Sequence, residues 1–338
     1  MNQDDFIIPD GYKSALDLHE TQVGIKTIKD FFQKMLAERL NLLRVSAPLF
    51  VDPQSGLNDN LNGVERPVTF DISTEGNREA EIVHSLAKWK RYALKKYGFS
   101  EDEGLYTDMS AIRRDENVDN IHSIYVDQWD WERIIDKQQR TEDYFKETVR
   151  TIYKALRKTE QFMSIQYDYI DEILPHDIFF ITSQELEDMF PDNTPREREY
   201  YITQAKGAVC IMKIGDKLES GEKHDGRAPD YDDWALNGDI LVYYPVLDIA
   251  LELSSMGIRV DKKSMLDQLD KAGCPERAKL PFHKAVINGE LPYTIGGGIG
   301  QSRICMFFLR KAHIGEVQCS LWPDDVMKKA VDNGIELL

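Results

Sequence analysis

The sequence predicts an α+β protein in which amphipathic helices accompany strands that pair along the chain. Apolar residues recur every three or four positions over residues 22–42 and 141–163, which is the spacing of helices with one buried face. Residues 105–112 and 121–132 have the pattern of two strands around a polar loop. Residues 237–244 and 250–260 form a further strand pair, for which we expect a hairpin turn near Pro245.

Composition indicates a soluble globular protein, and we expect one cytoplasmic domain over residues 1–338. The formal net charge of −17 argues against extended nucleic-acid contact, which requires clustered cations. No apolar run approaches the roughly 18 residues that a membrane span needs, and the acidic N-terminus does not resemble a signal peptide. The four cysteines are far apart and form no C-x-x-C pair, which fits a reducing cytosol.

A strand-like run with a proline follows the first helix, over residues 43–51. Because Pro48 cannot donate to a strand ladder, we expect an edge or interface element. A dimer contact and ordinary core packing explain this segment equally well. The next stretch, residues 52–64, is a polar, turn-rich loop whose Asp59 is a candidate for holding an ammonium group.

A basic helix is predicted from Leu86 to Gly98. Its cations are typical of a solvated helix face. Lys90 nevertheless lies near the helix start, beside a possible Ser85 cap, where an anion is also favoured. The basic block comprises Lys88, Lys90, Arg91, Lys95 and Lys96.

Strand alternation places Gln128 and Asp130 on one face with Ile124 and Val126. Such a face is suited to a small polar ligand, although a buried hydrogen-bonded pair is an alternative.

The later helices and strands carry clearer boundary signals. Capping boxes run from Thr182 to Glu185 and from Thr194 to Glu197, and the second predicts a helix that ends at Gly207. The apolar run over 208–214 predicts a buried strand. We interpret the 141–163 helix as packing.

Two acidic features follow. The segment 224–234 holds four aspartates around Arg227, which by itself is typical of a solvated loop; an amine site, a metal site or a carboxylate-anchored arginine are the alternatives. In the 237–260 hairpin, Asp239 and Glu252 would face each other. Facing carboxylates are costly without a cation, so Mg²⁺ with nucleotide phosphates, or a different register with solvent exposure, would explain them.

The stretch from Thr294 to Arg303 carries four glycines before an apolar run. Glycine tolerates positive φ and lets a ligand approach the backbone, while arginine suits phosphate or purine stacking. We predict a nucleotide at this stretch, with a tight strand-to-helix turn as the plain alternative. It is not a dinucleotide fingerprint, because Arg303 replaces the third glycine and few residues follow.

In their order, these segments resemble motifs 1, 2 and 3 of the class II aminoacyl-tRNA synthetase core. Gly298-Ile299-Gly300-Gln301-Ser302-Arg303 matches the motif 3 pattern G-x-G-x-x-R. Motif 2 reads Phe-Arg-x-Glu in that family, and here Ile112-Arg113-Arg114-Asp115 carries Ile for Phe and Asp for Glu. A shifted match, Arg114-Asp115-Glu116, leaves open which arginine serves the α-phosphate.

Four longer motifs more closely resemble the aspartate–ammonia ligase family, the ammonia-dependent asparagine synthetases of the A type. The resemblance covers nearly the whole chain. The motifs are residues 84–91 (HSLAKWKR), 125–132 (YVDQWDWE), 227–234 (RAPDYDDW) and 252–259 (ELSSMGIR).

This resemblance implies a mainly antiparallel sheet flanked by helices, in a homodimer without an anticodon-binding domain. It implies that aspartate attacks the α-phosphorus of ATP to form β-aspartyl-AMP and pyrophosphate, and that ammonia then displaces AMP. Arg303 would also stack on adenine. The implied roles are catalytic for Lys90, Arg113 and Arg303; aspartate binding for Asp59, Ser85, Gln128, Asp130, Arg227, Asp232 and Ser254; ATP binding for Arg113, Arg259, Gly298, Gly300 and Arg303; and Mg²⁺ binding for Asp239 and Glu252.

Two other functions are compatible with the same core. One is a different adenylate-forming ligase that modifies a macromolecule. The net charge of −17 argues against tRNA as that macromolecule. The other is a catalytically silent paralogue, which loss of a motif arginine or carboxylate would favour. Arg113, Arg303, Asp239 and Glu252 are all present.

Overall fold

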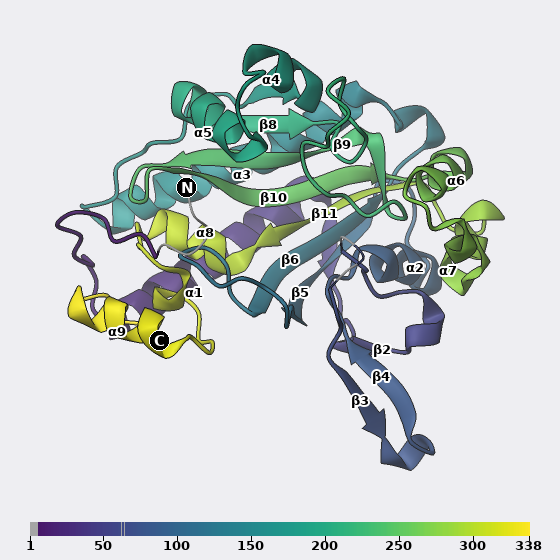
Figure 1. The fold of residues 1–338 in the computed structure, drawn as a ribbon, viewed down its shortest axis with the longest axis horizontal. Helices are drawn as coiled ribbons and strands as arrows, with labels where there is room; N and C mark the ends of the chain where they lie inside the picture. The colour runs from purple at the N-terminus through teal and green to yellow at the C-terminus, as the bar shows by residue number, and fades with distance from the viewer. Residues whose placement is uncertain (1–5, 62, 64) are drawn as a thin grey trace.

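The computed structural model describes residues 6–61, 63 and 65–338, and its centre is an eight-stranded sheet (Figure 1). Its two edge pairs, β1–β5 and β7–β8, are parallel, and every other neighbouring pair is antiparallel. In spatial order the strands are β1 (Leu42–Arg44), β5 (Gly104–Ile112), β6 (Tyr125–Ile134), β11 (Thr294–Gly300), β10 (Ile249–Arg259), β9 (Asp232–Tyr244), β8 (Ala208–Met212) and β7 (Phe179–Thr182).

A second, three-stranded sheet projects from the body of the molecule (Figure 1). Its order is β2 (Phe50–Val51), β4 (Arg78–Ile82) and β3 (Thr69–Ile72), with both pairs antiparallel. The long connection from β2 to β3 contains Asp59, so this sheet anchors both ends of the Asp59 loop. Residues 62 and 64 of that loop lie outside the described residues.

Helices cover the two faces of the large sheet unequally. Helices α1, α3 and α8 share one continuous core with the sheet, in which Phe32 contacts Trp129 and Phe31 stacks on Phe162. On the opposite face, α2 lies over β5, β6 and β11, while α4 contacts β7 and α5 lies over β8, β9 and β10. The helices are α1 (Leu18–Leu40), α2 (Ala87–Tyr97), α3 (Glu142–Gln166), α4 (Ser183–Met189), α5 (Pro195–Lys206), α6 (Lys262–Lys271), α7 (Pro281–Ile287), α8 (Gln301–Phe308) and α9 (Asp324–Asp332).

Most element predictions are confirmed. The first helix begins four residues earlier than predicted because Asp17 and Glu20 form a capping box at its start. Both predicted capping boxes, at Thr182 and Thr194, are present. Within the described residues, no helix is long and apolar enough to span a membrane.

The single strand predicted over 43–51 is wrong. The chain leaves the large sheet after Arg44, passes through Pro48, and enters the small sheet at Phe50. A proline that cannot donate to a ladder thus lies between two short strands. The expectation of an edge position is confirmed, since β1 is the last strand of the large sheet.

The β9–β10 hairpin is confirmed, but its predicted register is not. The chain turns over residues 245–248, and Asp239 pairs with Ser255 while Glu252 pairs with Leu241. An irregularity between Glu252 and Ser254 shifts the register along β10. Asp239 and Glu252 are therefore not opposite each other.

Candidate active site

A cavity of about 580 Å³ opens on the sheet face away from α1 and α3, over β6, β11 and β10. The alternation of β6 explains its floor. Trp129 and Trp131 are fully buried in the core with α1, so Gln128 and Asp130 face the opposite side and line the cavity. The predicted shared face of these two residues is confirmed.

The glycine-rich stretch is a strand rather than a turn. It forms β11 between β6 and β10, and none of its four glycines has a positive φ. The glycines are needed for space instead. A Cβ on Gly296 would collide with the Glu132 carboxylate, and one on Gly298 would collide with the Gln128 side chain. At Gly300 the nearest atom would be the Arg303 Cβ, at an ordinary 3.4 Å, so this position faces open cavity.

This difference predicts opposite consequences for two alanine substitutions. Gly296→Ala should destabilise the protein by about 1–3 kcal/mol, because the new methyl group overpacks a buried ion pair. Gly300→Ala should leave the thermal unfolding midpoint nearly unchanged but raise the KM for a nucleotide lying over β11. Differential scanning fluorimetry and steady-state kinetics on both variants measure this; equal destabilisation would contradict it.

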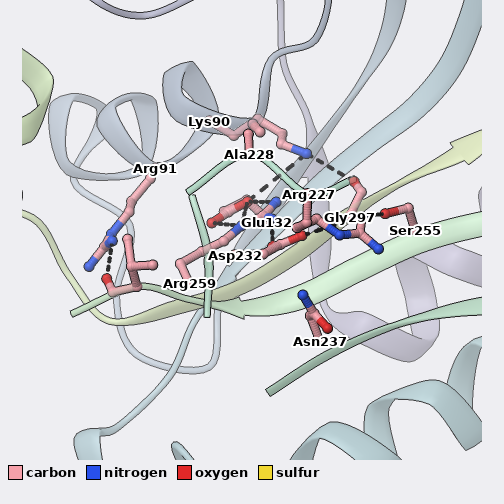
Figure 2. Close-up of polar contacts among 12 residues, drawn as sticks. Lys90, Arg91, Glu132, Arg227, Ala228, Asp232, Asn237, Ser255, Arg259 and Gly297 are labelled. Carbon is pink, nitrogen blue, oxygen red and sulfur yellow. Dashed lines mark hydrogen bonds and ion pairs between the residues drawn. The ribbon is translucent and has the colours of Figure 1, made fainter. Parts of the chain in front are cut away.

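Lys90 lies at the centre of the charged floor. It is completely buried, and its ammonium donates to Asp130. It also donates to the Gly297 carbonyl at 2.9 Å, as Figure 2 shows. The Glu132 carboxylate is 4.0 Å away. Burial lowers the pKa of Lys90, and the negative charges of Asp130 and Glu132 oppose that shift.

A second buried cation, Arg259, is fixed by two carboxylates. Its Nε and Nη2 donate to Glu132 at 2.8–3.0 Å, and its Nη1 donates to Asp232 (Figure 2). Burial alone would raise the pKa of Glu132, but Arg259 and Lys90 hold it below its ordinary value. Arg259 is only 2 % exposed, and the Glu132 and Asp232 carboxylates already occupy its guanidinium.

Arg227 is anchored in the same way, from the segment 224–231. It donates to Ser255 and, at 2.6 Å, to Asp239, and its Nη1 lies 3.8 Å from Asp232. The solvated loop favoured from composition is wrong for this segment. Asp230, Asp232 and Asp233 are buried and ion-paired, and the carboxylate-anchored arginine is what the structure contains.

The solvated face expected for α2 is also wrong at its start. Lys88, Lys90 and Arg91 are buried, whereas Lys95 and Lys96 are exposed. Lys88 pairs with Asp230 at 3.3 Å, on the side of the helix away from Lys90's partners.

Asp59 and Ser85 meet above this floor. The Ser85 hydroxyl donates to the Asp59 carboxylate at 2.7 Å, and both residues line the cavity. Asp59 also accepts the Leu61 N–H at 2.8 Å, which fixes the loop around it. Ser85 is not the helix cap that its position suggested, because α2 begins after Leu86.

Two less constrained arginines line the other part of the cavity. The Arg113 guanidinium pairs loosely with the Glu116 carboxylate, 3.9 Å away. The Nε of Arg113 has no hydrogen-bond partner among the described residues. Arg303 donates to the Glu252 carbonyl at 3.0 Å and lies 3.5 Å from the Glu252 carboxylate. Arg114 is exposed and lies outside the cavity lining, so Arg113 is the arginine that the fold places at the site.

Most predicted site residues line this one cavity, and two do not. Ser254 donates to the Gly298 carbonyl at 3.1 Å, and its neighbour Ser255 reaches the cavity instead. Asp239 lies behind Arg227, outside the lining. The predicted residues that line the cavity are Asp59, Ser85, Lys90, Arg113, Gln128, Asp130, Arg227, Asp232, Glu252, Arg259, Gly298, Gly300 and Arg303.

Sequence reasoning missed Glu132 and Ser255. Glu132 follows Asp130 by two residues on β6, so strand alternation alone could have added it to the cavity face. Ser255 could not have been separated from Ser254, because the shift in β10 decides which serine points inward.

Comparison with known proteins agrees with this geometry. The family model described as AsnA, aspartate-ammonia ligase, matches residues 19–334. A curated relative from Ruminiclostridium cellulolyticum, named aspartate–ammonia ligase, is 64% identical over 332 residues, which cover 98% of this chain and 99% of that protein. The chain belongs to the aspartate–ammonia ligase family. This ligase therefore joins aspartate and ammonia to give asparagine.

Other relatives and solved structures extend the comparison. An aspartate–ammonia ligase of Limosilactobacillus reuteri is 57% identical, over 99% of this ligase and 100% of the relative. The Entamoeba histolytica asparaginyl-tRNA synthetase bound to asparaginyl-adenylate superposes with a TM-score of 0.62 at 11% identity, over 90% of this ligase and 69% of that chain. The Pyrococcus horikoshii asparaginyl-tRNA synthetase gives 0.62 at 14% identity, over 90% and 70%. At these identities the likeness shows the fold, which confirms the predicted class II synthetase-like core.

Proposed function

We propose that this ligase activates aspartate with ATP in the described cavity. The β-carboxylate of aspartate attacks the α-phosphorus of ATP, which forms β-aspartyl-AMP and releases pyrophosphate. Ammonia then attacks the acyl carbon, AMP leaves, and one proton is released with asparagine. The observation that supports this reaction is that the cavity holds two kinds of cation. Lys90 is fully buried among carboxylates, whereas Arg113 and Arg303 line the cavity and are paired less tightly.

The carboxylate-rich part suits the amino acid. Asp59, Asp130 and Asp232 provide acceptors for an ammonium group, while Lys90 and Arg227 provide the cations that a dicarboxylate requires. Gln128 and Ser85 add neutral hydrogen-bond groups beside them. In place of Ser254 we assign Ser255 to this pocket. Lys90 would stabilise negative charge as the carboxylate reacts.

The looser arginines suit the triphosphate. Arg113 and Arg303 present planar cations to a cavity that β11 keeps clear with Gly298 and Gly300. Because the substrate carboxylate is itself the nucleophile, the protein's task is positioning and charge stabilisation. For Arg259 we propose a supporting role, since Glu132 and Asp232 already occupy its guanidinium.

The residues fit a magnesium ion only in part. No group of three potential ligands gathers within the part of the chain that the structure describes. Mg²⁺ bound to nucleotides usually needs only one or two carboxylates besides phosphates and water. Glu252 lines the cavity and would hold such an ion, which would neutralise phosphate charge. Asp239 fits poorly because Arg227 holds it at 2.6 Å.

The proposal includes a homodimer in the cytoplasm. Leu43, Leu49 and Phe50 are 44–62 % exposed at β1, β2 and their connection, which supports an interface at this part of the protein.

Oxygen tracing tests the activation step. Aspartate labelled with ¹⁸O in its β-carboxylate should transfer one label to AMP, because that oxygen becomes bonded to the α-phosphorus. Mass spectrometry of AMP and orthophosphate measures the transfer. Label in orthophosphate together with ADP formation would instead indicate an acyl phosphate and would overturn the adenylate. Unlabelled AMP would overturn it as well.

A further inference from the structure

Helix α8 carries Arg303 in its first turn but cannot cap its own N-terminus. The first N–H groups of a helix need acceptors from outside the helix. The residue at the cap position is Gly300, which has no side chain to offer. A larger residue there would extend into the cavity, so the requirement for open space conflicts with the requirement for a cap.

The neighbouring strand β6 supplies the missing acceptor through Asp127. Its Oδ1 accepts the Ser302 N–H at 3.0 Å, one residue before Arg303. The same oxygen accepts Gln318 Nε2 at 3.2 Å, and Gln318 also donates to the Ser302 hydroxyl at 3.0 Å. On the other carboxylate oxygen, Lys29 of α1 donates at 3.1 Å. Asp127 is 8 % exposed, and Asp127, Ser302 and Gln318 all line the cavity, so this cap lies at the cavity wall.

We propose that Asp127 is a positioning residue that caps α8 from β6 and thereby sets the position of Arg303 over the cavity. A negative carboxylate is favourable at a helix N-terminus, and Lys29 balances its charge from the other side. Among the residues that the structure describes, the Arg303 side chain is held only by the Ile121 and Glu252 carbonyls, at 3.4 and 3.0 Å, and by the Glu252 carboxylate at 3.5 Å. Its placement therefore depends on where α8 begins.

The cap has a second consequence for phosphate recognition. A helix N-terminus after a glycine-rich strand is an anion site in many nucleotide-binding proteins. Here the Asp127 carboxylate already occupies it, so a triphosphate would be repelled from the Ser302 N–H. Phosphate recognition in this enzyme falls to the arginine side chains, which makes the position of Arg303 critical. This inference rests on the ATP role proposed for Arg303.

Three substitutions at Asp127 test the proposal through ATP–pyrophosphate exchange. Asp127→Leu keeps the branching at Cγ but removes the acceptor, and should raise the KM for ATP by roughly 10- to 100-fold through misplacement of Arg303. The KM for aspartate should change less than about threefold, because the Asp127 carboxylate contacts Lys29, Ser302 and Gln318 and none of the residues assigned to aspartate. Asp127→Asn retains an oxygen for the Ser302 N–H and should restore the KM for ATP to within about threefold of the wild type. If Asp127→Leu does not fold, Asp127→Glu, which displaces the carboxylate by one methylene, should give the same selective rise.

The outcomes separate the cap from general stability and from the ATP proposal. A folded Asp127→Leu or Asp127→Glu with both KM values unchanged, or with both raised equally, would overturn the positioning role. An Asp127→Asn variant as impaired as Asp127→Leu would overturn it too. Arg303→Ala is measured in parallel. If it leaves ATP kinetics intact, the ATP role itself fails; if it impairs them while the Asp127 variants do not, only the cap is refuted.

Discussion

Arg303→Ala should abolish most ATP–pyrophosphate exchange while leaving the protein folded. The guanidinium lies at the cavity wall, and the Glu252 carboxylate beside it is partly exposed, so the guanidinium is available to a nucleotide. Removal of one preorganised donor that stabilises transition-state charge costs on the order of 10²–10³ in rate. The measurement is incorporation of labelled pyrophosphate into ATP in the presence of aspartate and Mg²⁺. Arg303→Lys should recover only part of the rate, because an ammonium cannot form the planar, two-pronged contact.

Arg310 provides a matched control just beyond the same helix. It lies outside the cavity lining and pairs with Glu160 at 3.2 Å. Arg310→Ala should lower the thermal unfolding midpoint while retaining exchange. Full exchange in Arg303→Ala would contradict the proposed phosphate role. An equal loss of exchange in both variants would show that the substitutions act by disturbing the fold.

Local signals were sufficient for most of the secondary structure. Capping boxes at Thr182 and Thr194 predicted helix starts correctly because a cap is a contact between residues close in sequence. The motif resemblance named residues from β6, β10, β11 and α2 that the structure places around one cavity. The alternation of β6 correctly placed Gln128 and Asp130 together, since side chains in a strand follow a fixed period.

The errors arose where the answer depends on partners distant in sequence. Whether Lys88 is solvated depends on Asp230, which lies 142 residues away. An irregularity in β10 after Glu252 decides that Ser255, not Ser254, faces inward, and local sequence did not indicate it. The turn that was the alternative for the glycine-rich stretch is excluded by packing against Glu132 and Met256 on the neighbouring strands, which makes the stretch a strand.

Lys90→Met should inactivate the enzyme and destabilise it together. Methionine has similar length, so the packing of the stem is largely retained while the charge is lost. Asp130 would then remain buried without its cation, which costs about 3–5 kcal/mol in comparable cases. Loss of the charge that we propose stabilises the reacting carboxylate should lower kcat on the order of 10²–10³-fold. Urea unfolding and steady-state asparagine formation measure the two effects separately.

Lys88→Met is the matched control, because the two lysines lie two residues apart on α2 and are equally buried. Asp230 would keep His283 at 3.0 Å and Arg277 at 3.8 Å, so the loss of stability should be smaller. Since Lys88 does not line the cavity, kcat should fall far less than in Lys90→Met. Equal kcat in the two variants would show that Lys90 only holds the floor of the cavity together.

The wild-type rate should also decline on the alkaline side, at a pH below the pKa of an ordinary lysine. Burial lowers the pKa of Lys90, and deprotonation removes the charge that we assign to catalysis.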